Sequence, residues 1–358
     1  MADSVNQNVL RERVETLLSD CCESLEEYIQ GSHHLTYIAQ MSRTGKKLVR
    51  IEAVYSQTSN RGGSGLAARN KMPSEIATMR FLKEHTAIPV PGIFGYDADV
   101  DGRVGGRFVV MEYIDGRSVD KVLWEALTSA QREKLALSLA DLWANLMRKS
   151  FHRIGSLHQR ADGEFYIGPM TFLPSNNFYA VSAPEEAKCG PFTSPKDWLE
   201  ASARRDLAYK LSLSPPPEAP ARIKAVLDHI RSSNELETSM LWDASHFSIE
   251  HVDFSTHNIL VSRTDPTVIL TVLDWEGARI VPMWAMNPAF RWPRNSNKNE
   301  NKHLRALMRQ RICSLVPGWE AAIGDECRQL RILCQKASLS DRNPEIILSD
   351  VLFMVDDM

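Results

Sequence analysis

The stretch Ile249-Glu250-His251-Val252-Asp253-Phe254-Ser255-Thr256-His257-Asn258-Ile259-Leu260-Val261 decides the fold, together with the run Val268-Ile269-Leu270-Thr271-Val272-Leu273-Asp274-Trp275-Glu276. In the first run a polar loop leads into an apolar strand. A turn follows at Thr264-Asp265-Pro266, and the second run is an apolar strand that ends at an aspartate. A hairpin of this kind places Asp253, Asn258 and Asp274 near one end of two adjacent strands.

Two carboxylates and an amide at one place form a set of hard oxygen donors. Magnesium prefers such ligands and completes its shell with water and phosphate oxygens. Phosphoryl transfer needs metal ions to neutralise the phosphates and a carboxylate to orient the attacking hydroxyl. The alternative is a hairpin whose acidic residues have no chemical role, since Asp and Asn are common in turns.

The spacing His251-x-Asp253-x4-Asn258, with a further aspartate 274 − 253 = 21 residues on, resembles the aminoglycoside phosphotransferase and choline kinase-like family, especially its fungal phosphotransferase branch. That family has a His-Gly-Asp-x4-Asn-Ile-Leu loop and an apolar strand ending in Ile-Asp-Trp-Glu. The resemblance implies an α+β, two-lobed protein kinase-like fold, with a small antiparallel β lobe containing one helix and a larger, mainly helical lobe. It implies that Asp253 is the catalytic base or orients the hydroxyl, and that Asn258 and Asp274 bind Mg²⁺.

Weaker similarities lie upstream. Gly31-Ser32-His33 matches the family's short turn over the phosphates, where backbone amides can face phosphate oxygens, although a helix C-cap glycine explains it equally well. Arg50 stands where kinases place the strand lysine that holds the phosphates, and Glu75 would be its partner on a helix. The alternative for both is a pair of surface charges.

The strand that runs into Glu112, Tyr113 and Ile114 matches the hinge between the lobes, whose backbone pairs with adenine in such folds. Two positions depart from the family pattern. Val252 replaces the usual glycine, and a β-branched residue restricts the loop conformation. His257 replaces a small residue, and we expect it to pack rather than to touch phosphate or substrate.

Along the chain, we expect a β-rich nucleotide-binding lobe over residues 1–115 and a helical lobe over 116–358, with an acceptor-binding insertion at about 150–235. The apolar patterns predict both helices and strands. The helices are expected over 9–29, 73–85, 119–127, 130–149, 196–211 and 221–232 and in the tail, and the strands over 34–41, 47–55, 93–96, 107–113 and within 248–275. Residues 56–72 are expected to form a loop, and 150–195 to be irregular.

The bulk composition limits the partners and the compartment. The 358 residues include 42 Lys and Arg and 45 Asp and Glu, which gives a net charge of −3. This charge provides no basic field that would attract nucleic acid or an anionic membrane. The six cysteines form no Cys-x-x-Cys pair, which favours reduced thiols over disulfides or zinc. Without a signal-peptide pattern, we expect a cytoplasmic protein.

The sequence thus predicts an ATP- and Mg²⁺-dependent kinase for the hydroxyl of a small molecule, such as an amino alcohol, an aminoglycoside-like sugar or a secondary metabolite. Arg50 and Val252 motivate an alternative, a nucleotide-binding scaffold with little or no activity. A family member that performs another transfer in a biosynthetic pathway is also open. Nothing in the sequence indicates the oligomeric state.

Overall fold

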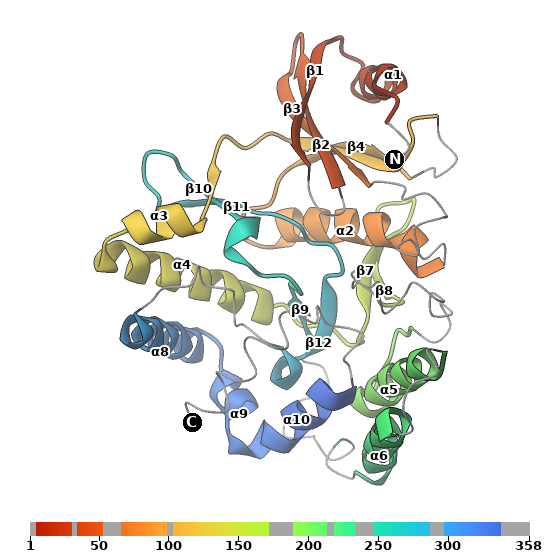
Figure 1. The fold of residues 1–358 in the computed structure, drawn as a ribbon, viewed down its shortest axis with the longest axis vertical. Helices are drawn as coiled ribbons and strands as arrows, with labels where there is room; N and C mark the ends of the chain where they lie inside the picture. The colour runs from red at the N-terminus through yellow and green to blue at the C-terminus, as the bar shows by residue number, and fades with distance from the viewer. Residues whose placement is uncertain are drawn as a thin grey trace.

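The computed structural model describes residues 5–30, 34–52, 66–98, 103–171, 189–212, 218–233, 236, 247–286 and 297–337. Figure 1 shows a small β-sheet at the top of the molecule and a larger, mostly helical part below it. Residues 113–116 connect the last strand of this sheet to the rest of the chain. The α+β class predicted from the sequence is therefore confirmed.

The upper sheet has five antiparallel strands in the order β1-β2-β3-β5-β4. The strands are β1 (Cys22–Gln30), β2 (His34–Met41), β3 (Gly45–Glu52), β4 (Ile93–Asp97) and β5 (Phe108–Glu112). The expected hairpin at Arg43-Thr44-Gly45 is present, and Gly45 has a φ of +70°, a conformation that glycine adopts without strain. This sheet carries the first half of the candidate site.

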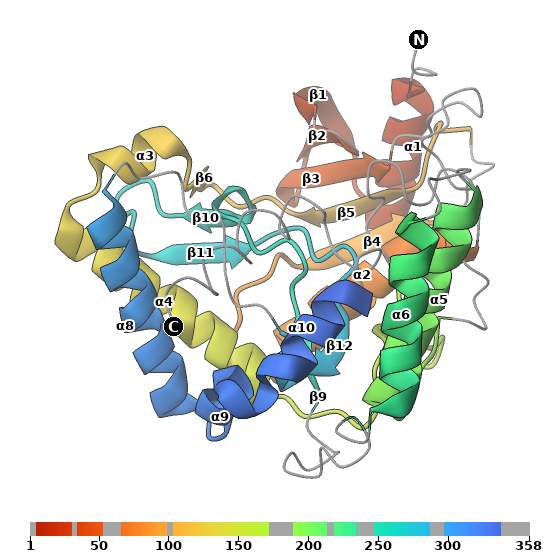
Figure 2. The ribbon, with the colours of Figure 1, turned by 60° about the horizontal axis from the view of Figure 1, so that its bottom comes forward.

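Helix α1 (Gln7–Leu18) covers one face of the sheet (Figure 2). Leu10 and Val14 of this helix are fully buried in a cluster that includes Val49 and Val110. Alternate residues of a strand point to opposite faces, so the neighbours of Val49 and Val110 must face the other way.

Helix α2 (Leu66–His85) covers that other face. Met72 and Ile76 of α2 form a buried cluster with Val109 and Met111 of β5. Arg50 lies directly opposite Val109 in the β3–β5 ladder. Directly opposed residues share a face, so the Arg50 side chain must point towards α2.

The prediction of one helix over 9–29 was wrong in its second half, because α1 ends at Leu18 and β1 begins at Cys22. Ser19 has a left-handed backbone with φ of +48°, which ends the helix. The Asp20 carboxylate then accepts hydrogen bonds from the Thr44 backbone N–H at 3.0 Å and the Ser42 hydroxyl at 2.8 Å. These bonds tie the chain to the β2–β3 turn, and pairing with β2 outweighs the helical pattern.

The helix expected from Pro73 begins earlier, at Leu66, with Pro73 inside it. The predicted loop over 56–72 was therefore wrong for residues 66–72, and residues 53–65 lie outside the described part. A proline normally disfavours a helix interior. Here the turn before Pro73 is held by tertiary contacts, since Lys71 and Met72 are both buried, and such contacts override local propensity.

The lower part contains the β10–β11 hairpin, two further strand pairs and the remaining helices (Figure 1). A small sheet has the order β11-β10-β6, and β12 pairs with β9. The strands are β6 (Arg117–Ser118), β7 (Ser156–Gln159), β8 (Phe165–Gly168), β9 (Phe247–Glu250), β10 (Ile259–Val261), β11 (Ile269–Val272) and β12 (Arg279–Pro282). The β7–β8 hairpin corrects the expectation that 150–195 is wholly irregular.

The helices of the lower part agree with the expected helical pattern, including the helical tail. They are α3 (Lys121–Ala126), α4 (Ser129–Met147), α5 (Pro195–Ser212), α6 (Glu218–Ser232), α8 (Lys298–Leu315), α9 (Trp319–Ile323) and α10 (Arg328–Ala337). Short 3-10 turns lie at Thr256–Asn258, Met283–Ala285 and Asp325–Cys327. Within the described residues, no helix is both long and apolar enough to cross a membrane.

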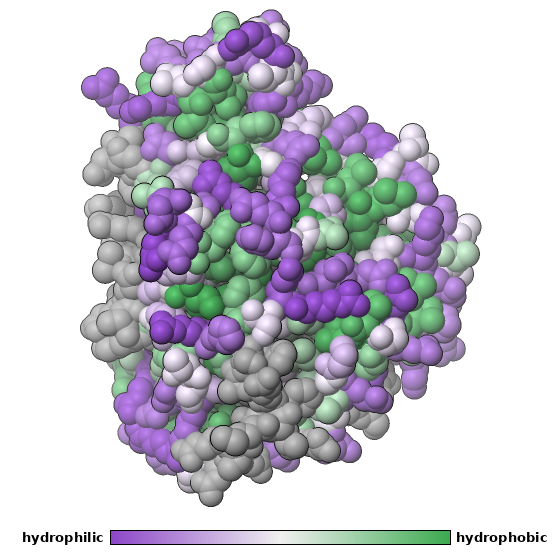
Figure 3. Space-filling view, turned by 180° about the vertical axis from the view of Figure 1, so that it is seen from behind, coloured by the Kyte–Doolittle hydropathy of each residue, from purple (hydrophilic) through white to green (hydrophobic). Residues whose placement is uncertain are grey.

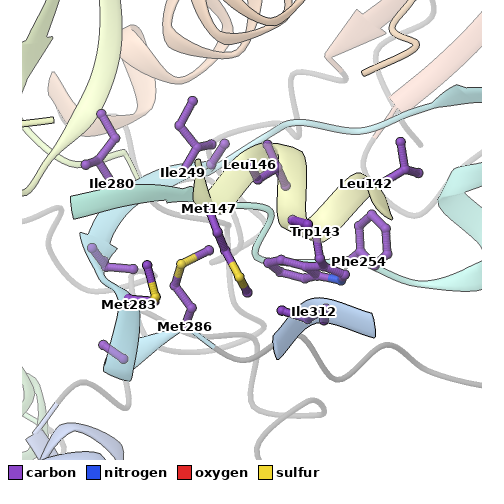
Figure 4. Close-up of a cluster of buried hydrophobic side chains, with 14 of the residues drawn as sticks. Leu142, Trp143, Leu146, Met147, Ile249, Phe254, Ile280, Met283, Met286 and Ile312 are labelled. Carbon is purple, nitrogen blue, oxygen red and sulfur yellow. The ribbon is translucent and has the colours of Figure 1, made fainter. Parts of the chain in front are cut away.

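A buried cluster that includes Phe254 fixes the position of the loop over residues 251–258 (Figure 4). Phe254, the residue after Asp253, points into this cluster and meets the Trp143 ring of α4 edge-on at 5.0 Å. Truncating a buried aromatic of this size to alanine costs about 3–5 kcal/mol. Phe254 therefore anchors the loop directly beside Asp253.

Among the described residues, the large hydrophobic side chains that remain exposed lie on several elements, with Phe94 and Tyr96 both on β4, and in the back view hydrophilic side chains lie among the apolar ones (Figure 3). The most exposed of them is Val122 of α3, at 72%. Scattered exposure of this kind is normal for a folded domain.

Candidate active site

The hairpin β10–β11 has the predicted antiparallel pairing, with Ile259 opposite Val272. Asn258 directly precedes β10 and Asp274 closely follows β11, so both lie at the same end of the hairpin. The Leu273 backbone N–H donates to the Asn258 carbonyl oxygen at 2.7 Å and extends the ladder to this end. The amide and the carboxylate are thus brought together by strand pairing.

Asp253 is placed by the loop that precedes β10. The Asn258 amide nitrogen donates to the Asp253 carbonyl oxygen at 2.9 Å and faces its carboxylate at 3.4 Å. The Ser255 N–H donates to the same Asp253 carbonyl at 2.8 Å. Because the amide nitrogen of Asn258 faces Asp253, its amide oxygen is left for another partner.

His251 links this loop to the end of β11. Its Nδ1 accepts the Asp253 backbone N–H at 3.2 Å, and its Nε2 lies 2.9 Å from the Leu273 carbonyl oxygen. Both bonds are satisfied by the neutral ring that carries its proton on Nε2. Burial lowers the pKa of His251 and favours that neutral form. One imidazole therefore sets the distance between Asp253 and the residue before Asp274.

Arg50 and Glu75 meet as the sheet geometry requires. The Arg50 Nη2 forms a buried ion pair with the Glu75 carboxylate, and the Arg50 Nη1 lies 3.5 Å from Asp274 Oδ1. The side chains of Arg50 and Glu75 are only 12% and 2% exposed. The alternative of two surface charges is therefore wrong, and the pair connects β3 and α2 to the end of β11.

Asp274 is held in an unusual state. Its φ of +60° is a left-handed conformation that few residues other than glycine adopt, and such outliers cluster at functional sites. Burial and the nearby charge of Glu276 raise its pKa to about 7, with Arg50 acting in the opposite direction. The position combines backbone strain with a carboxylate that is costly to ionise.

The structure adds a second ion-pair group that the sequence analysis did not find. Glu276, 3% exposed, pairs with the Lys71 ammonium of α2, and its Oε2 lies 3.3 Å from His34 Nε2. Lys71 also lies 2.7 Å from Glu52 Oε1. Burial opposes ionisation of Glu276, but Lys71 and His34 outweigh it and lower the pKa of Glu276 to about 2.

The atoms around Asp274 fit a divalent cation and phosphate. Among the described residues, no hydrogen bond reaches the buried atoms Asp274 Oδ1, Glu75 Oε1 and Arg50 Nε. Buried polar atoms are normally hydrogen-bonded, so Asp274 Oδ1, which lies 3.5 Å from Arg50 Nη1, keeps the capacity to accept from or coordinate a ligand. Asp274 Oδ1 and the amide oxygen of Asn258 are ligands of the type that Mg²⁺ takes, and the Arg50 guanidinium suits phosphate. Excess negative charge in the site also favours a cation.

The predicted hinge residues lie where the sheet gives way to the lower part. The Glu112 carboxylate accepts the Gly92 N–H at 2.9 Å and lies 3.2 Å from Lys83, so its side chain is engaged locally. The Tyr113 ring meets that of Tyr28 edge-on at 6.4 Å. The Ile114 carbonyl accepts the Gly116 N–H at 2.9 Å. A nucleotide role for this backbone stays a prediction.

Three other sequence predictions have different outcomes. Gly31, Ser32 and His33 lie outside the described residues, so their phosphate role stays a prediction. His257 is exposed in the 3-10 turn, so the expectation that it packs was wrong. Val252 is partly buried beside Asp253, and the loop accommodates it with the hydrogen bonds of Asp253 intact.

A family model described as "Phosphotransferase enzyme family" matches residues 25–285. The chain belongs to this family. The match begins in β1 and ends beyond Asp274, so it includes every residue placed in the site above. The recognition made from the loop and the strand end is therefore confirmed.

Two curated relatives of this phosphotransferase family member are longer than this chain. A subtelomeric hrmA-associated cluster protein of Aspergillus fumigatus is 23% identical over 321 residues, 76% of this chain and 61% of its own length. An altered inheritance of mitochondria protein 9, mitochondrial, of Yarrowia lipolytica is 25% identical over 206 residues, 50% of this chain and 34% of its own length. The chain thus spans about 61% and 34% of these relatives.

Solved structures show the same kinase-like fold. APH(2")-IIa, in a complex with streptomycin and ATP, aligns with a TM-score of 0.54 at 11% identity, over 99% of this chain and 96% of that one. A putative fructosamine-3-kinase from Thermobifida fusca aligns with a TM-score of 0.51 at 16% identity, over 98% and 99%. The predicted fold class is confirmed, while the lobe boundary at 115/116 stays a prediction.

Proposed function

We propose that this phosphotransferase family member transfers the γ-phosphate of ATP, with Mg²⁺, to the hydroxyl of a small molecule. The observation that supports this most strongly is the contact between the Arg50–Glu75 ion pair and Asp274 at the end of the β10–β11 hairpin. Arg50 of β3, paired with Glu75 of α2, reaches Asp274 at 3.5 Å, and Asn258 lies at the same hairpin end. Family membership and the ATP complex of APH(2")-IIa point in the same direction.

In this proposal each residue has one task. Asn258 and Asp274 would hold Mg²⁺, which would neutralise phosphate charge when bound. Arg50 donates to phosphate oxygens from a position that Glu75 fixes. Asp253 orients the acceptor hydroxyl and takes its proton as the phosphate is transferred.

The nucleotide would lie between the upper sheet and the β10–β11 hairpin. The backbone of Glu112, Tyr113 and Ile114 would meet adenine, and Gly31, Ser32 and His33 would cover the phosphates. The acceptor would enter from the insertion over about 150–235, which includes α5 and α6. An amino alcohol, an aminoglycoside-like sugar or a secondary metabolite are the candidate acceptors.

The test is a transfer assay with ¹⁸O-labelled γ-phosphate ATP and a panel of hydroxyl metabolites, read by mass spectrometry of the phosphate esters. We expect at least one labelled ester that requires Mg²⁺ and is lost in Asp253→Ala. A scaffold would bind Mg²⁺–ATP but label no acceptor. Absence of Mg²⁺-dependent nucleotide binding would reject both functions.

The compartment is tested separately. The sequence favours the cytoplasm, whereas the relatives named altered inheritance of mitochondria protein 9 carry the description mitochondrial. Microscopy of the full-length chain with a C-terminal fluorescent tag distinguishes the two, because a diffuse signal supports the cytoplasm and an organellar signal contradicts it.

A further inference from the structure

Lys71 is a buried cation that the proposed chemistry does not use. Its side chain is 9% exposed and lies between two carboxylates, Glu276 and Glu52. Burial alone would favour the neutral amine, but the two carboxylates raise the pKa of Lys71 above its usual value and keep it charged. A buried ammonium held in this way needs an explanation in terms of what it connects.

The helix geometry places Lys71 beside the phosphate-site ion pair. Lys71 and Glu75 are four residues apart on α2, so they lie on the same face one turn apart. Glu75 reaches Arg50 of the upper sheet, whereas Lys71 reaches Glu276 in the loop after β11. One helix face therefore carries both contacts.

The loop that carries Asp274 is short and held from both sides. Asp274 has a φ of +60° and Gly277 a φ of +70°, so two left-handed residues lie close together. On one side, the buried Trp275 donates from its indole N–H to the Val272 carbonyl at 3.1 Å. On the other side, the charged contacts of Glu276 are to Lys71 and His34. Loss of the second set would remove the charged contacts of Glu276 to α2 and β2, and among the described residues Arg50 at 3.5 Å would be the remaining charged contact of Asp274.

We propose that Lys71 is a positioning residue of the phosphotransferase site, which holds the metal-binding loop in place through its ion pair with Glu276. The inference rests on the proposed function, because it assigns Lys71 a role in binding Mg²⁺–ATP. Lys71 contacts neither metal nor phosphate in this role. It acts on Asp274 through Glu276, two residues further along the chain.

A simpler explanation is that Lys71 only neutralises the buried Glu276, since Glu52 is 20% exposed and also lies 3.7 Å from Arg107 Nη1. The two explanations differ for a double variant. Removing one partner of a buried pair leaves an uncompensated charge, whereas removing both is often tolerated. If Lys71 served only to compensate charge, Lys71→Met with Glu276→Gln would restore wild-type behaviour. If it positions the loop, the double variant folds but still binds Mg²⁺ poorly.

The experiment titrates Mg²⁺ at a fixed concentration of a fluorescent, non-hydrolysable ATP analogue, using the full chain. Lys71→Met, Lys71→Arg and the Lys71→Met/Glu276→Gln double variant are compared with the wild type, and thermal unfolding of each is recorded. Lys134→Met is the matched control, because Lys134 of α4 is 63% exposed and pairs only at 3.8 Å with Asp265. Asp274→Asn in the same titration tests the proposed metal site itself.

We expect Lys71→Met and the double variant to need at least tenfold more Mg²⁺ for half-maximal binding, with Lys71→Arg within threefold of the wild type and Lys134→Met unchanged. A double variant with the wild-type Mg²⁺ requirement overturns the proposal, while the proposed function survives if Asp274→Asn still abolishes Mg²⁺-dependent binding. If the wild type binds the ATP analogue independently of Mg²⁺, and Asp274→Asn binds it equally well, both the proposed function and this inference are overturned. If Lys71→Met alone does not fold, the double variant decides.

Discussion

Replacing Asp274 by asparagine should stabilise the metal-free protein while it removes the proposed metal site. Asparagine has nearly the same shape, adopts the left-handed conformation at least as readily as aspartate, and carries no charge. The carboxylate at this position lies close to those of Glu276 and Glu75. Without a cation, its ionised form works against folding.

The magnitude follows from the pKa. The folded protein raises the pKa of Asp274 from its usual 3.8 to about 7, so the contribution of Asp274 to stability is fully present below pH 3.8 and is lost progressively as the pH rises to 7. A shift of this size corresponds to roughly 4 kcal/mol at pH 8. The side chain is 33% exposed, and solvent screening reduces the figure to roughly 1–2 kcal/mol. Asp274→Asn should therefore gain about that much at pH 8.

The assay is urea unfolding in EDTA at pH 8 and at pH 4.5, for the wild type and Asp274→Asn. We expect the variant to be more stable at pH 8, with a gain about one quarter as large at pH 4.5, where Asp274 is protonated in the folded state. A variant that is less stable at pH 8, or a gain independent of pH, would refute the assignment of a partly buried carboxylate whose ionisation opposes folding.

Three further predictions concern other parts of the site. Arg50→Met should lower the free energy of unfolding in urea by about 3–5 kcal/mol, because Glu75 stays buried without its cation. An Arg50→Met/Glu75→Leu double variant should recover most of that loss, and equal losses in both variants would contradict this. Between pH 7.5 and 5.5, the wild type should lose more thermal stability than His251→Gln. The lowered pKa keeps the folded imidazole neutral while the unfolded chain takes up a proton below pH 6.5, so the stability from His251 is present above that pH and lost below it. An equal loss of melting temperature in both proteins would contradict this. Gly116→Ala should cost about 1–3 kcal/mol and weaken nucleotide binding in calorimetry, since a Cβ there would lie 3.0 Å from the Leu260 Cβ and 3.1 Å from the Val261 carbonyl oxygen; unchanged binding would show that the connector is not part of the site.

The sequence was sufficient to predict the β10–β11 hairpin because that part of the candidate site is local. Asp253, Asn258 and Asp274 lie within two adjacent strands and one loop, and strand pairing brings them together. Arg50 and Glu75 were also predicted correctly as a pair, from the resemblance. The β3–β5 register gives the physical reason, since it turns Arg50 towards α2.

The second ion-pair group could not be found in the same way. Lys71 was assigned to a loop, because Pro73 two residues later suggested a helix start. Only the packing of α2 against the sheet extends that helix backwards to Leu66. With Lys71 in a loop, no pattern connected it to Glu276, more than 200 residues further on by the numbering. Contacts between elements that are distant in sequence depend on tertiary packing and produce no periodic pattern in the sequence.

The measurement that tests the central claim most directly compares Asp253→Asn with the wild type in two assays on the same preparation. One is calorimetric binding of ATP in Mg²⁺, and the other is transfer of labelled γ-phosphate to the best acceptor of the hydroxyl panel. If Asp253 orients the acceptor while Asn258 and Asp274 hold the metal, ATP binding should stay within threefold of the wild type and transfer should fall by about 10²–10⁴-fold. Transfer at the wild-type rate in Asp253→Asn would contradict the account.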